Sequence, residues 1–429
     1  MSEPASKPAP IRSVKGTRDL LPRDTALWQR IEEEARRVFG AYHFGEIRTP
    51  ILEQTALFAR TVGEDTDIVA KEMYTFEDQS GDSLTLRPEA TASVVRAYIE
   101  RSMFNEGGVH KLYYIGPMFR RDRPQKGRYR QFYQIGAEVL GSEHPGVDVE
   151  VFEMLISFLS RLGLSNYTLL INSVGDRNCR PAYLTALREA LRGVKDQMCG
   201  DCQRRADTNP LRVLDCKVPA DQPIIDKLPR TIDHLDPECN RHFDDVLAGL
   251  DQRGIAYQVT PRLVRGLDYY TRTTYEITSD VLGAQNSILG GGRYDGLSEM
   301  LGGPPAPGTG FAIGEDRLVM AVEAAGQLKA ARSLQVYVAW LGESASEPAS
   351  KLARELRQRG VSVEMGYEPA KLKKALGTAS KLGARFAVII GEGELESGLY
   401  QVKDLDSGQQ ESVDPARLVE HIASKLAAK

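Results

Sequence analysis

Basic, aromatic and acidic side chains lie close together in residues 119–140. The stretch FRRDRPQKGRYR at 119–130 holds six basic residues around a proline and a glycine, which predicts a charged turn before a strand. Arginines suit phosphate oxygens, an aromatic ring can stack on a base, and Gln with Glu can hold an ammonium group. The pattern fits a nucleotide-binding sheet face, and a solvated charged turn fits it equally well. Because side chains alternate along a strand, one face should carry Arg128, Arg130, Phe132, Gln134 and Glu138.

Two other regions combine an arginine with glycines or tyrosines. The sequence LVRGLDYYT at 263–271 places an arginine before a glycine and two tyrosines. The segments GGGRYDGL (290–297) and GTGFAIGEDRL (308–318) could bring backbone close to a ligand, and the second leads into an amphipathic helix with Arg317. Such glycine-rich turns usually only redirect the chain. Neither segment matches the dinucleotide GxGxxG or the P-loop pattern, so a Rossmann or Walker enzyme is not supported.

The cysteines are a third group with possible chemistry. All five lie in one part of the chain, and Cys199 and Cys202 form a CxxC pair. Together with Cys216, and with Cys239 or His242, this pair could supply four ligands to a structural zinc ion. Reduced cysteines packed as small hydrophobic side chains would explain the pattern equally well.

Short strands separated by turns must position these groups. Apolar residues at helical spacing predict a helix over 24–39, which Asp19 or Asp24 could cap. The segments that follow are short and alternate with turns and a few helices, which indicates an α+β fold with a largely antiparallel sheet. The predicted strands span residues 111–119, 129–140, 257–259, 271–278 and 286–289.

The character of the chain changes along its length. Residues 176–254 contain several helical segments but few strand signals, so we expect them to form a domain inserted between two parts of a larger domain, 11–175 and 255–328. Alternating strands and helices then predict a separate α/β domain over 334–429 with its own sheet. Residues 1–10 are expected to be a disordered tail, without the apolar core of a signal peptide.

Composition limits the possible classes of protein. At 429 residues and 41% hydrophobic content, the chain is long enough for about two or three domains. No run reaches the roughly 18 consecutive apolar residues that span a bilayer, so membrane insertion is not expected. Five cysteines without a secretory signal predict reduced thiols in the cytosol. The net charge of −4 argues against coating of nucleic acid through a global field, so any RNA contact must use local basic patches.

Taken together, these segments resemble the histidyl-tRNA synthetase family of class II aminoacyl-tRNA synthetases along nearly the whole chain. EIRTPILE is similar to motif 1, with Pro50 at the position of the dimer-interface proline. Residues 119–141 resemble motif 2, and GFAIGEDRL resembles motif 3. LVRGLDYYT and LRPEATA (86–92) resemble the pair of segments specific to the histidine enzymes. The resemblance implies an antiparallel-sheet catalytic domain with an inserted domain, followed by a C-terminal α/β anticodon-binding domain.

The resemblance also implies roles for individual side chains. Arg120 and Arg317 match the motif 2 and motif 3 arginines that grip the α- and γ-phosphates of ATP. Phe132 matches the stacking partner of adenine, with Arg128 also in the ATP site. Arg265 matches the family's characteristic arginine at the α-phosphate, where other class II enzymes use an additional metal ion. The implied histidine pocket consists of Glu89, Ala90, Thr91, Gln134, Glu138, Arg265, Tyr269, Tyr270 and Tyr294.

The implied reaction is attack of the histidine carboxylate on the α-phosphorus of ATP, followed by transfer of histidine from the adenylate to the 3′ end of tRNA(His). ATP and Mg²⁺ are the implied cofactors. The implied partners are L-histidine, tRNA(His) and a second copy of the chain in a cytoplasmic homodimer, and no contact with DNA or a membrane is expected. None of the six histidines lies in the matched motifs, so a histidine nucleophile or base is not expected.

One alternative with the same fold is the histidine-sensing regulatory subunit of ATP phosphoribosyltransferase, a non-catalytic paralogue. Such proteins lack the anticodon-binding domain and usually have a degraded motif 2. Here Arg120, Arg265 and Arg317 are all present, and the chain continues far beyond motif 3. A purely structural role would leave Gln134, Glu138 and the arginines without a reason to share one sheet face. The ligase is therefore the favoured prediction.

Overall fold

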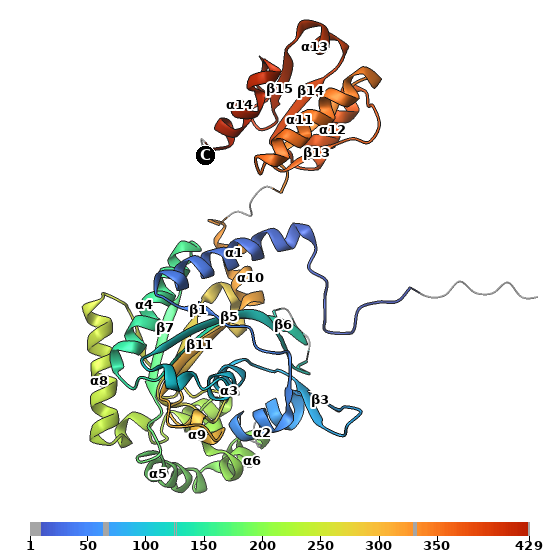
Figure 1. Ribbon diagram of the computed structural model, residues 1–429. Coiled ribbons are helices and arrows are strands. Elements are labelled where there is room, and N and C mark those ends of the chain that lie inside the picture. The colour runs from blue at the N-terminus through green and yellow to red at the C-terminus, as the bar shows by residue number, and fades with distance from the viewer. Residues whose placement is uncertain (1–9, 63–67, 124, 126, 329–332, 428–429) are drawn as a thin grey trace, which may run out of the picture. The chain divides into compact units, whose positions relative to one another are not determined.

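The computed structural model describes residues 10–62, 68–123, 125, 127–328 and 333–427. It divides into two compact units, Met1–Lys329 and Ala330–Lys429 (Figure 1). Of the tail expected at residues 1–10, only Pro10 belongs to the described residues. None of the helices in the described part of the chain is long and apolar enough to cross a membrane.

An eight-stranded sheet forms the centre of the first unit. Its strands pair antiparallel except at the two edges, where β1 runs parallel to β5 and β7 runs parallel to β8. The predicted α+β fold with a largely antiparallel sheet is thereby confirmed. In spatial order the strands are β1 (Gly45–Glu46), β5 (His110–Phe119), β6 (Gln131–Leu140), β11 (Gly308–Gly314), β10 (Ser287–Arg293), β9 (Thr271–Thr278), β7 (Thr168–Ser173) and β8 (Gln258–Val259).

Two strand boundaries differ from the predicted ones by two residues or more. Strand β6 begins at Gln131 rather than at 129, because the backbone N–H of Arg130 donates to the carbonyl of Gly16 (2.8 Å) instead of to a neighbouring strand. Strand β10 continues past the predicted end at 289 through three glycines, which stay paired with β9 on one side and β11 on the other.

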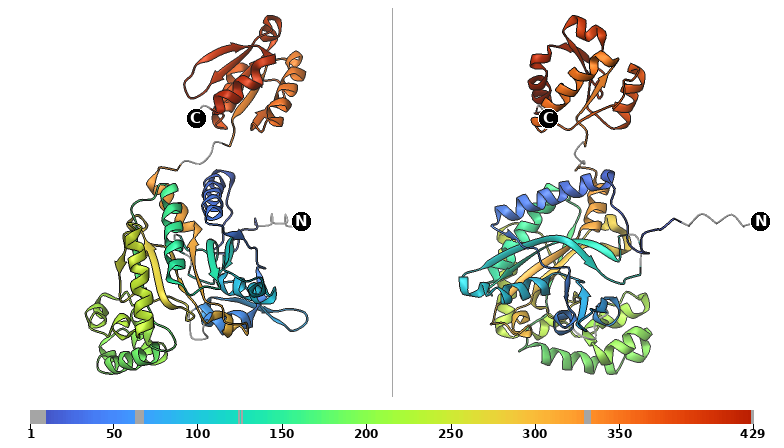
Figure 2. Two further views of the ribbon diagram at one scale, coloured as in Figure 1. Left: turned by 60° about the vertical axis from the view of Figure 1, so that its left-hand side comes forward. Right: turned by 45° about the vertical axis from the view of Figure 1, so that its right-hand side comes forward.

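Four helices cover one face of the large sheet and share its main core (Figure 2). Within this core the ring of Phe39 lies 5.5 Å from that of Phe158 and 5.8 Å from that of Phe311. Ile135 and Val139 of β6 point into the same core, so Gln134 and Glu138 face the opposite side. The four helices are α1 (Pro22–Ala41), α4 (Pro145–Arg161), α8 (Pro237–Gln252) and α10 (Glu315–Ala325).

The first helix starts earlier than its predicted residue 24. Leu21 is its N-cap, and Asp24 lies in the first turn, where its carboxylate accepts the backbone N–H of Leu21 (3.3 Å). Asp24 therefore satisfies a free N–H at the helix start from inside the helix, rather than from the cap position.

Smaller elements surround the opposite face of the large sheet. Helix α3 (Thr91–Glu100) and the short α9 (Leu297–Met300) pack there with Tyr114, Met118 and Tyr269. A three-stranded sheet in the order β2-β4-β3 lies beside them, as Figure 2 shows, together with α2 (Thr55–Val62). Its strands are β2 (Leu52–Gln54), β3 (Tyr74–Glu77) and β4 (Ser83–Leu86).

Short helices with a small core of their own make up most of residues 176–254. This core contains Leu187, Cys202 and Cys216. The last helix of the region, α8, packs instead against α4 and places Phe243 and Leu250 in the main core. Helix α8 therefore belongs to the main core and not to the small core of the insertion. The helices of the region are α5 (Arg180–Arg192), α6 (Gly200–Thr208) and α7 (Gln222–Ile225), with 3-10 turns at Pro210–Val213, Pro219–Asp221 and Thr231–His234.

The second unit is an α/β domain with a five-stranded sheet in the order β13-β12-β14-β15-β16. Its first three strands in the chain are parallel, and the last two are antiparallel. The strands are β12 (Val336–Trp340), β13 (Val363–Met365), β14 (Phe386–Ile390), β15 (Tyr400–Asp404) and β16 (Gln410–Val413). The helices are α11 (Ser346–Gln358), α12 (Leu372–Lys381), α13 (Glu392–Ser397) and α14 (Pro415–Ala427).

Candidate active site

A cavity of about 350 Å³ opens between segments that are far apart in the chain. Most of the predicted site residues line it. Glu138 and Ala90 lie behind this lining, Glu138 in direct contact with Thr91 and Tyr294. The predicted residues in the lining are Glu89, Thr91, Arg120, Arg128, Phe132, Gln134, Arg265, Tyr269, Tyr270, Tyr294 and Arg317.

Glu138 is fully buried, and hydroxyl groups surround its carboxyl group. Thr91 Oγ1 donates to one oxygen at 2.7 Å, and the Tyr294 hydroxyl donates to the other at 2.5 Å. Burial raises the pKa of Glu138 to about 8, against the lowering effect of these two hydrogen bonds. A neutral carboxylic acid is therefore favoured near neutral pH.

A second carboxyl group lies at the start of α3. Glu89 accepts the backbone N–H groups of Thr91 (2.7 Å) and Ala92 (3.1 Å), and burial raises its pKa. The side-chain oxygen of Gln134 is buried and has no hydrogen-bond partner among the described residues. Two acids and an unpaired amide oxygen thus offer acceptors to a ligand that carries an ammonium group or a ring N–H.

Four arginines supply positive charge to the same cavity: Arg120, Arg128, Arg265 and Arg317. Arg120 donates through Nε to the carbonyl of Pro88 (2.9 Å), and its guanidinium carbon lies 5.3 Å from the centre of the Phe132 ring. Arg317 donates to the carbonyl of Ser287 (3.1 Å). Burial lowers the pKa of both guanidinium groups, yet arginine stays charged at neutral pH. Fixed, partly desolvated arginines of this kind suit phosphate oxygens.

The third arginine, Arg265, lies between an acid and a glycine. Its Nη1 is 3.4 Å from Glu276 Oε2, and its buried Nε has no hydrogen-bond partner among the described residues. A β-carbon at Gly290 would lie only 1.9 Å from Arg265 Nη2, so the guanidinium occupies the space that a side chain at 290 would take. Glu276 was not singled out from the sequence, where alternation in the predicted strand 271–278 is its only signal.

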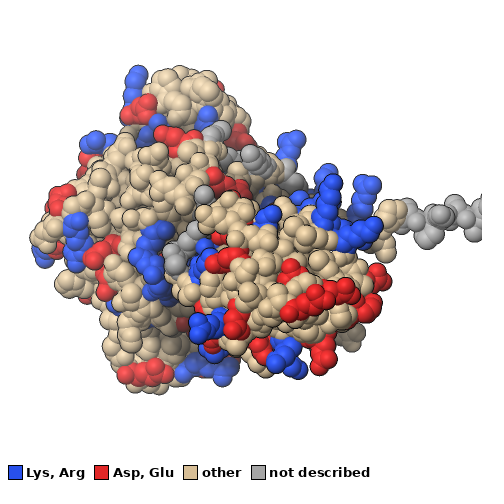
Figure 3. All heavy atoms as spheres, turned by 90° about the horizontal axis from the view of Figure 1, so that it is seen from above, with Lys and Arg blue, Asp and Glu red and all other residues tan. Residues whose placement is uncertain are grey.

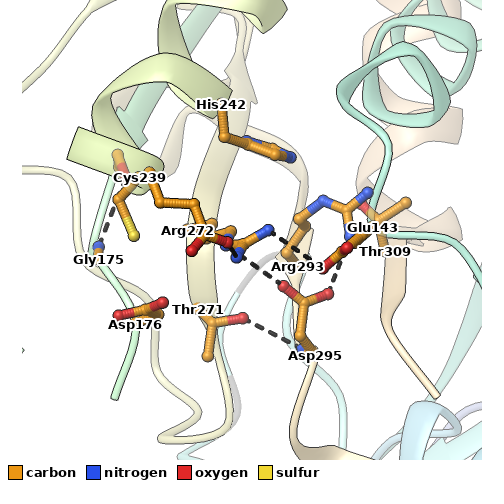
Figure 4. Close-up of polar contacts among 12 residues, drawn as sticks. Glu143, Gly175, Asp176, Cys239, His242, Thr271, Arg272, Arg293, Asp295 and Thr309 are labelled. Atoms are coloured by element: carbon orange, nitrogen blue, oxygen red, sulfur yellow. Dashed lines mark hydrogen bonds and ion pairs between the residues drawn. The ribbon is translucent and has the colours of Figure 1, made fainter. Parts of the chain in front are cut away.

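A buried ion-pair network fixes the segment that carries Tyr294. The neighbouring Arg293 is fully buried, and its Nε donates to Asp148 Oδ2 at 2.8 Å. Its Nη1 donates to Asp295 at 2.8 Å, and Figure 4 shows Arg293 and Asp295 beside Arg272 and His242. In the sequence, this arginine is only one residue of a glycine-rich turn. Asp295 is only two residues away, but Asp148 is distant in the sequence, so the fold had to bring it close before this partner could be recognised.

The cysteines do not form the predicted set of four. Cys199, Cys202 and Cys216 lie together, with Asp221 as their fourth neighbour. Cys239 lies against Cys179 instead, with 3.8 Å between the two sulfur atoms. Because Cys239 is in the first turn of α8, it belongs to the junction with the main core. Cys239 was therefore the wrong choice of fourth ligand.

Pro50 lies away from the cavity, on the surface beside the three-stranded sheet. It is exposed, and Ile51 and Leu52 after it expose 41% and 46% of their surface. Pro50 also lines a groove with Glu53 and Leu57. The first unit therefore exposes apolar surface at the segment where the resemblance implies a dimer interface.

An antiparallel sheet with fixed arginines beside a pocket of buried carboxyl groups, followed by a separate α/β domain, defines a class II aminoacyl-tRNA synthetase. Residues 16–318 match the histidyl-tRNA synthetase family, and residues 335–425 match the anticodon binding domain. The chain therefore belongs to the histidyl-tRNA synthetase family. The predicted fold class, including the C-terminal domain, is confirmed.

Individual proteins support this membership. The chain is 59% identical to a histidine–tRNA ligase of Koribacter versatilis over 98% of this chain and 97% of the relative, and 59% identical to one of Solibacter usitatus over 93% and 96%. The crystal structure of apo histidyl-tRNA synthetase from S. aureus matches with a TM-score of 0.80 at 40% identity, covering 96% of this chain and 99% of that one. A Bacillus halodurans structure titled as an ATP phosphoribosyltransferase regulatory subunit/histidyl-tRNA synthetase is only 22% identical (TM-score 0.65; coverage 90% and 99%), so it shares the fold alone.

Proposed function

We propose that the protein is a histidine–tRNA ligase, which activates L-histidine with ATP and transfers it to the 3′ end of tRNA(His). One observation carries this proposal: the cavity joins four arginines to a pocket of two buried carboxyl groups and an unpaired amide oxygen. The arginines suit a triphosphate, and the carboxyl groups with the amide oxygen suit an amino acid with a basic side chain. High identity to ligases over nearly the whole chain supports the same substrates.

In the first step, the histidine carboxylate attacks the α-phosphorus of ATP, the bond to the β-phosphate oxygen breaks, and diphosphate leaves. Negative charge then grows on the α-phosphoryl oxygens. We propose that Arg120 and Arg265 stabilise that charge, and that Arg317 binds the γ-phosphate. Because these groups are already held by Pro88, Glu276 and Ser287, little reorganisation is needed when the reaction occurs. Phe132 would stack on the adenine, near Arg128.

The same proposal gives the carboxyl groups and hydroxyls a role in choosing histidine. Glu89, Gln134 and Glu138 would accept from the α-ammonium group and the imidazole, with Thr91 and Tyr294 orienting Glu138 through the hydrogen bonds described above. Tyr269 and Tyr270, whose ring centres are 4.9 Å apart, would form a wall of the pocket. An amino acid without a ring N–H would leave these buried groups unpaired, which disfavours its binding.

Mg²⁺ fits the phosphate end of this cavity, because Asp122 and Glu276 line it with the oxygen donors that this ion prefers. We propose that Mg²⁺ enters with ATP and is bound mainly by the phosphates, with one of these carboxylates as a further ligand. When bound, it would neutralise charge on the triphosphate.

The proposed assembly is a cytoplasmic homodimer that binds tRNA(His). The exposed segment from Pro50 to Leu52 supports an interface with a second copy of the chain. Recognition of the tRNA would need local basic patches, because basic and acidic side chains are interspersed on the face shown in Figure 3. The C-terminal domain is the proposed anticodon reader, in keeping with the family that it matches.

ATP–diphosphate exchange with each amino acid in turn tests this function. We expect exchange to depend on L-histidine and on Mg²⁺. Exchange with another amino acid and none with histidine would contradict the proposed substrate. If folded, dimeric protein binds histidine but shows no exchange, a regulatory histidine sensor would be favoured instead.

A further inference from the structure

Three sulfur atoms and a carboxylate converge in the inserted region, at what we call the thiol cluster: Cys199, Cys202, Cys216 and Asp221. One ligand atom from each residue lies within 4.8 Å of all the others. The Sγ atoms of Cys199 and Cys216 are 3.9 Å apart, and Cys216 Sγ is 3.2 Å from Asp221 Oδ2. Tetrahedral zinc with Zn–S bonds of about 2.3 Å requires sulfur atoms roughly 3.8 Å apart. The cluster already has nearly these dimensions.

Local structure holds the ligands in place. Cys199 is the N-cap of α6, and Cys202 follows it within the first turn. The backbone N–H of Cys199 donates to both carboxylate oxygens of Asp221 (3.0 and 3.2 Å), and the N–H of Val218 donates to Cys216 Sγ (3.4 Å). N–H groups directed at sulfur and carboxylate oxygen are the outer hydrogen bonds that orient metal ligands.

The carboxylate of the thiol cluster is held by hydrogen bonds rather than by a cationic side chain. Cys202, Cys216 and Asp221 are buried, and no Lys or Arg forms an ion pair with Asp221 among the described residues. A Zn²⁺ ion bound by the thiolates would place a positive charge beside this buried carboxylate.

The thiol cluster also contacts the loop that carries Arg265. Gln222, next to Asp221, donates to the carbonyl of Cys216 (2.8 Å) and accepts from Arg262 Nη2 (2.8 Å). Arg212 donates to the carbonyl of Gly266 at 3.1 Å. Val264 is buried in the same small core as Cys202 and Cys216. Hydrogen bonds and packing therefore connect the cluster to the loop on both sides of Arg265.

We propose that one structural Zn²⁺ is bound by the thiol cluster and braces the loop 262–268. The second sulfur pair, Cys179 and Cys239, is a natural comparison, because it also lies near two acids, Asp176 and Asp236. There, however, the Arg272 guanidinium lies close by and provides positive charge (Figure 4). That pair is not assigned a metal.

Elemental analysis of the full-length, tag-free protein, stripped of metal and then refilled, tests the ligand set. We expect about one zinc per chain in the wild type and in Cys239→Ser, and less than about one tenth of that in Cys202→Ser and Asp221→Asn. Co²⁺ in place of Zn²⁺ should show thiolate charge-transfer bands in the wild type. Zinc retained in both cluster variants, zinc lost from Cys239→Ser, or a Cys199–Cys216 disulfide in place of zinc would each overturn the proposal.

Limited proteolysis tests the bracing separately from any activity. Trypsin cleaves after arginine, so cleavage at Arg262 and Arg265 reports how well the loop is held. We expect chelation to speed cleavage there at least about tenfold in the wild type, and zinc to reverse the change; Cys239→Ser should behave like the wild type. Unchanged cleavage after zinc removal would overturn the bracing. Since neither measurement uses ATP or histidine, both outcomes are independent of the proposed ligase activity.

Discussion

Among the single residues of the site, Arg265 is tightly held by its neighbours. It is held against Glu276 and Gly290, and its Nε lacks a partner among the described residues. A buried donor without a partner is costly in the empty cavity, so a bound ligand that accepts its hydrogen would recover that cost. Phosphate oxygen is such an acceptor.

We predict that Arg265→Ala lowers the turnover of histidine-dependent exchange by about a hundredfold or more, or roughly 3 to 4 kcal/mol, with a smaller effect on histidine binding. The reason is that the arginine is proposed to meet charge that grows in the transition state. Arg253→Ala is the matched control, because Arg253 forms an exposed pair with Glu153. A loss of less than about tenfold in folded Arg265→Ala protein would exclude the role.

Glu138→Gln should act on binding instead of turnover. The amide keeps the shape of the side chain but cannot become a carboxylate to hold a cationic ligand, so we predict that the histidine concentration for half-maximal exchange rises by at least about tenfold. Titration of histidine at saturating ATP measures this. A large fall in turnover at saturating histidine, with the half-maximal concentration unchanged, would argue against the assignment.

The pKa of Glu138 predicts a pH dependence of stability. Because this pKa is raised from 4.5 to about 8 in the folded protein, the folded state keeps a proton that the unfolded state loses between these values. Stability is therefore fully present below about pH 4.5 and declines as pH rises toward 8, by up to about 1.4 kcal/mol per unit. Urea denaturation without ligands should show the wild type losing stability relative to Glu138→Gln across this window. A difference that does not change with pH would contradict the raised pKa.

At the scale of elements, β10 provides both the floor of the cavity and the space for Arg265. Its glycines continue the sheet while leaving room above it, because a side chain at Gly290 would overlap the guanidinium. On the neighbouring β11, a β-carbon at Gly310 would lie 1.8 Å from Glu138 Oε2. The two strands thus shape the phosphate side and the carboxyl side of the site.

Gly290→Ala should therefore displace Arg265 and reproduce most of the loss caused by Arg265→Ala. We predict that the double variant is hardly worse than either single one, since both changes remove the same interaction. The exchange rates of the wild type, the two single variants and the double variant form a double-mutant cycle, which measures the coupling between the two changes. Gly40→Ala is the control, because a β-carbon there meets no atom within 4 Å and Gly40 lies in α1, outside the cavity lining. Additive losses in the double variant would show that Gly290 acts by another route.

At the scale of the whole molecule, the proposed chemistry and the proposed anticodon contacts belong to different units. Every residue assigned to the adenylate lies before residue 329, and the anticodon binding domain match lies within 335–425. The second unit has its own core of Val336, Leu352 and Phe386. The two halves of the proposed reaction can therefore be separated by experiment.

Deleting residues 334–429 should leave histidine-dependent exchange largely intact and reduce histidylation of tRNA by at least about a hundredfold, because the deleted unit contains none of the adenylate residues. Both activities are measured on the same preparation, and the ratio of the two losses is the informative quantity, since the deletion could also weaken the dimer. Equal losses in a folded, dimeric truncation would contradict the division.

Charge reversal of Lys373 and Lys374 is the milder counterpart of the deletion. Both side chains are exposed on α12, where they could contact the phosphate backbone of the tRNA. Lys373→Glu with Lys374→Glu should weaken tRNA binding and flatten its salt dependence, with exchange unchanged. If the salt dependence of tRNA binding is unaltered, these lysines belong to a solvated helix face that does not contact the tRNA.

Features that depend on local order along the chain could be predicted from the sequence alone. Alternation placed Gln134 and Glu138 on one face of β6, because the period of two is a property of any extended strand. The motif segments identified the family, which the matches over 16–318 and 335–425 confirm. The fold class followed from the succession of short strands and from the later strand–helix alternation.

Which distant residues meet depends on the folded arrangement of the whole chain. Glu276 became a partner of Arg265, and Asp221 took the place expected for Cys239, because the chain between them folds back through contacts that no local pattern encodes. Helix α8 joined the main core for a similar reason: its apolar face finds α4, far earlier in the chain. Periodicity predicts which side of an element is apolar. Which surface covers that side depends on how all the elements pack together.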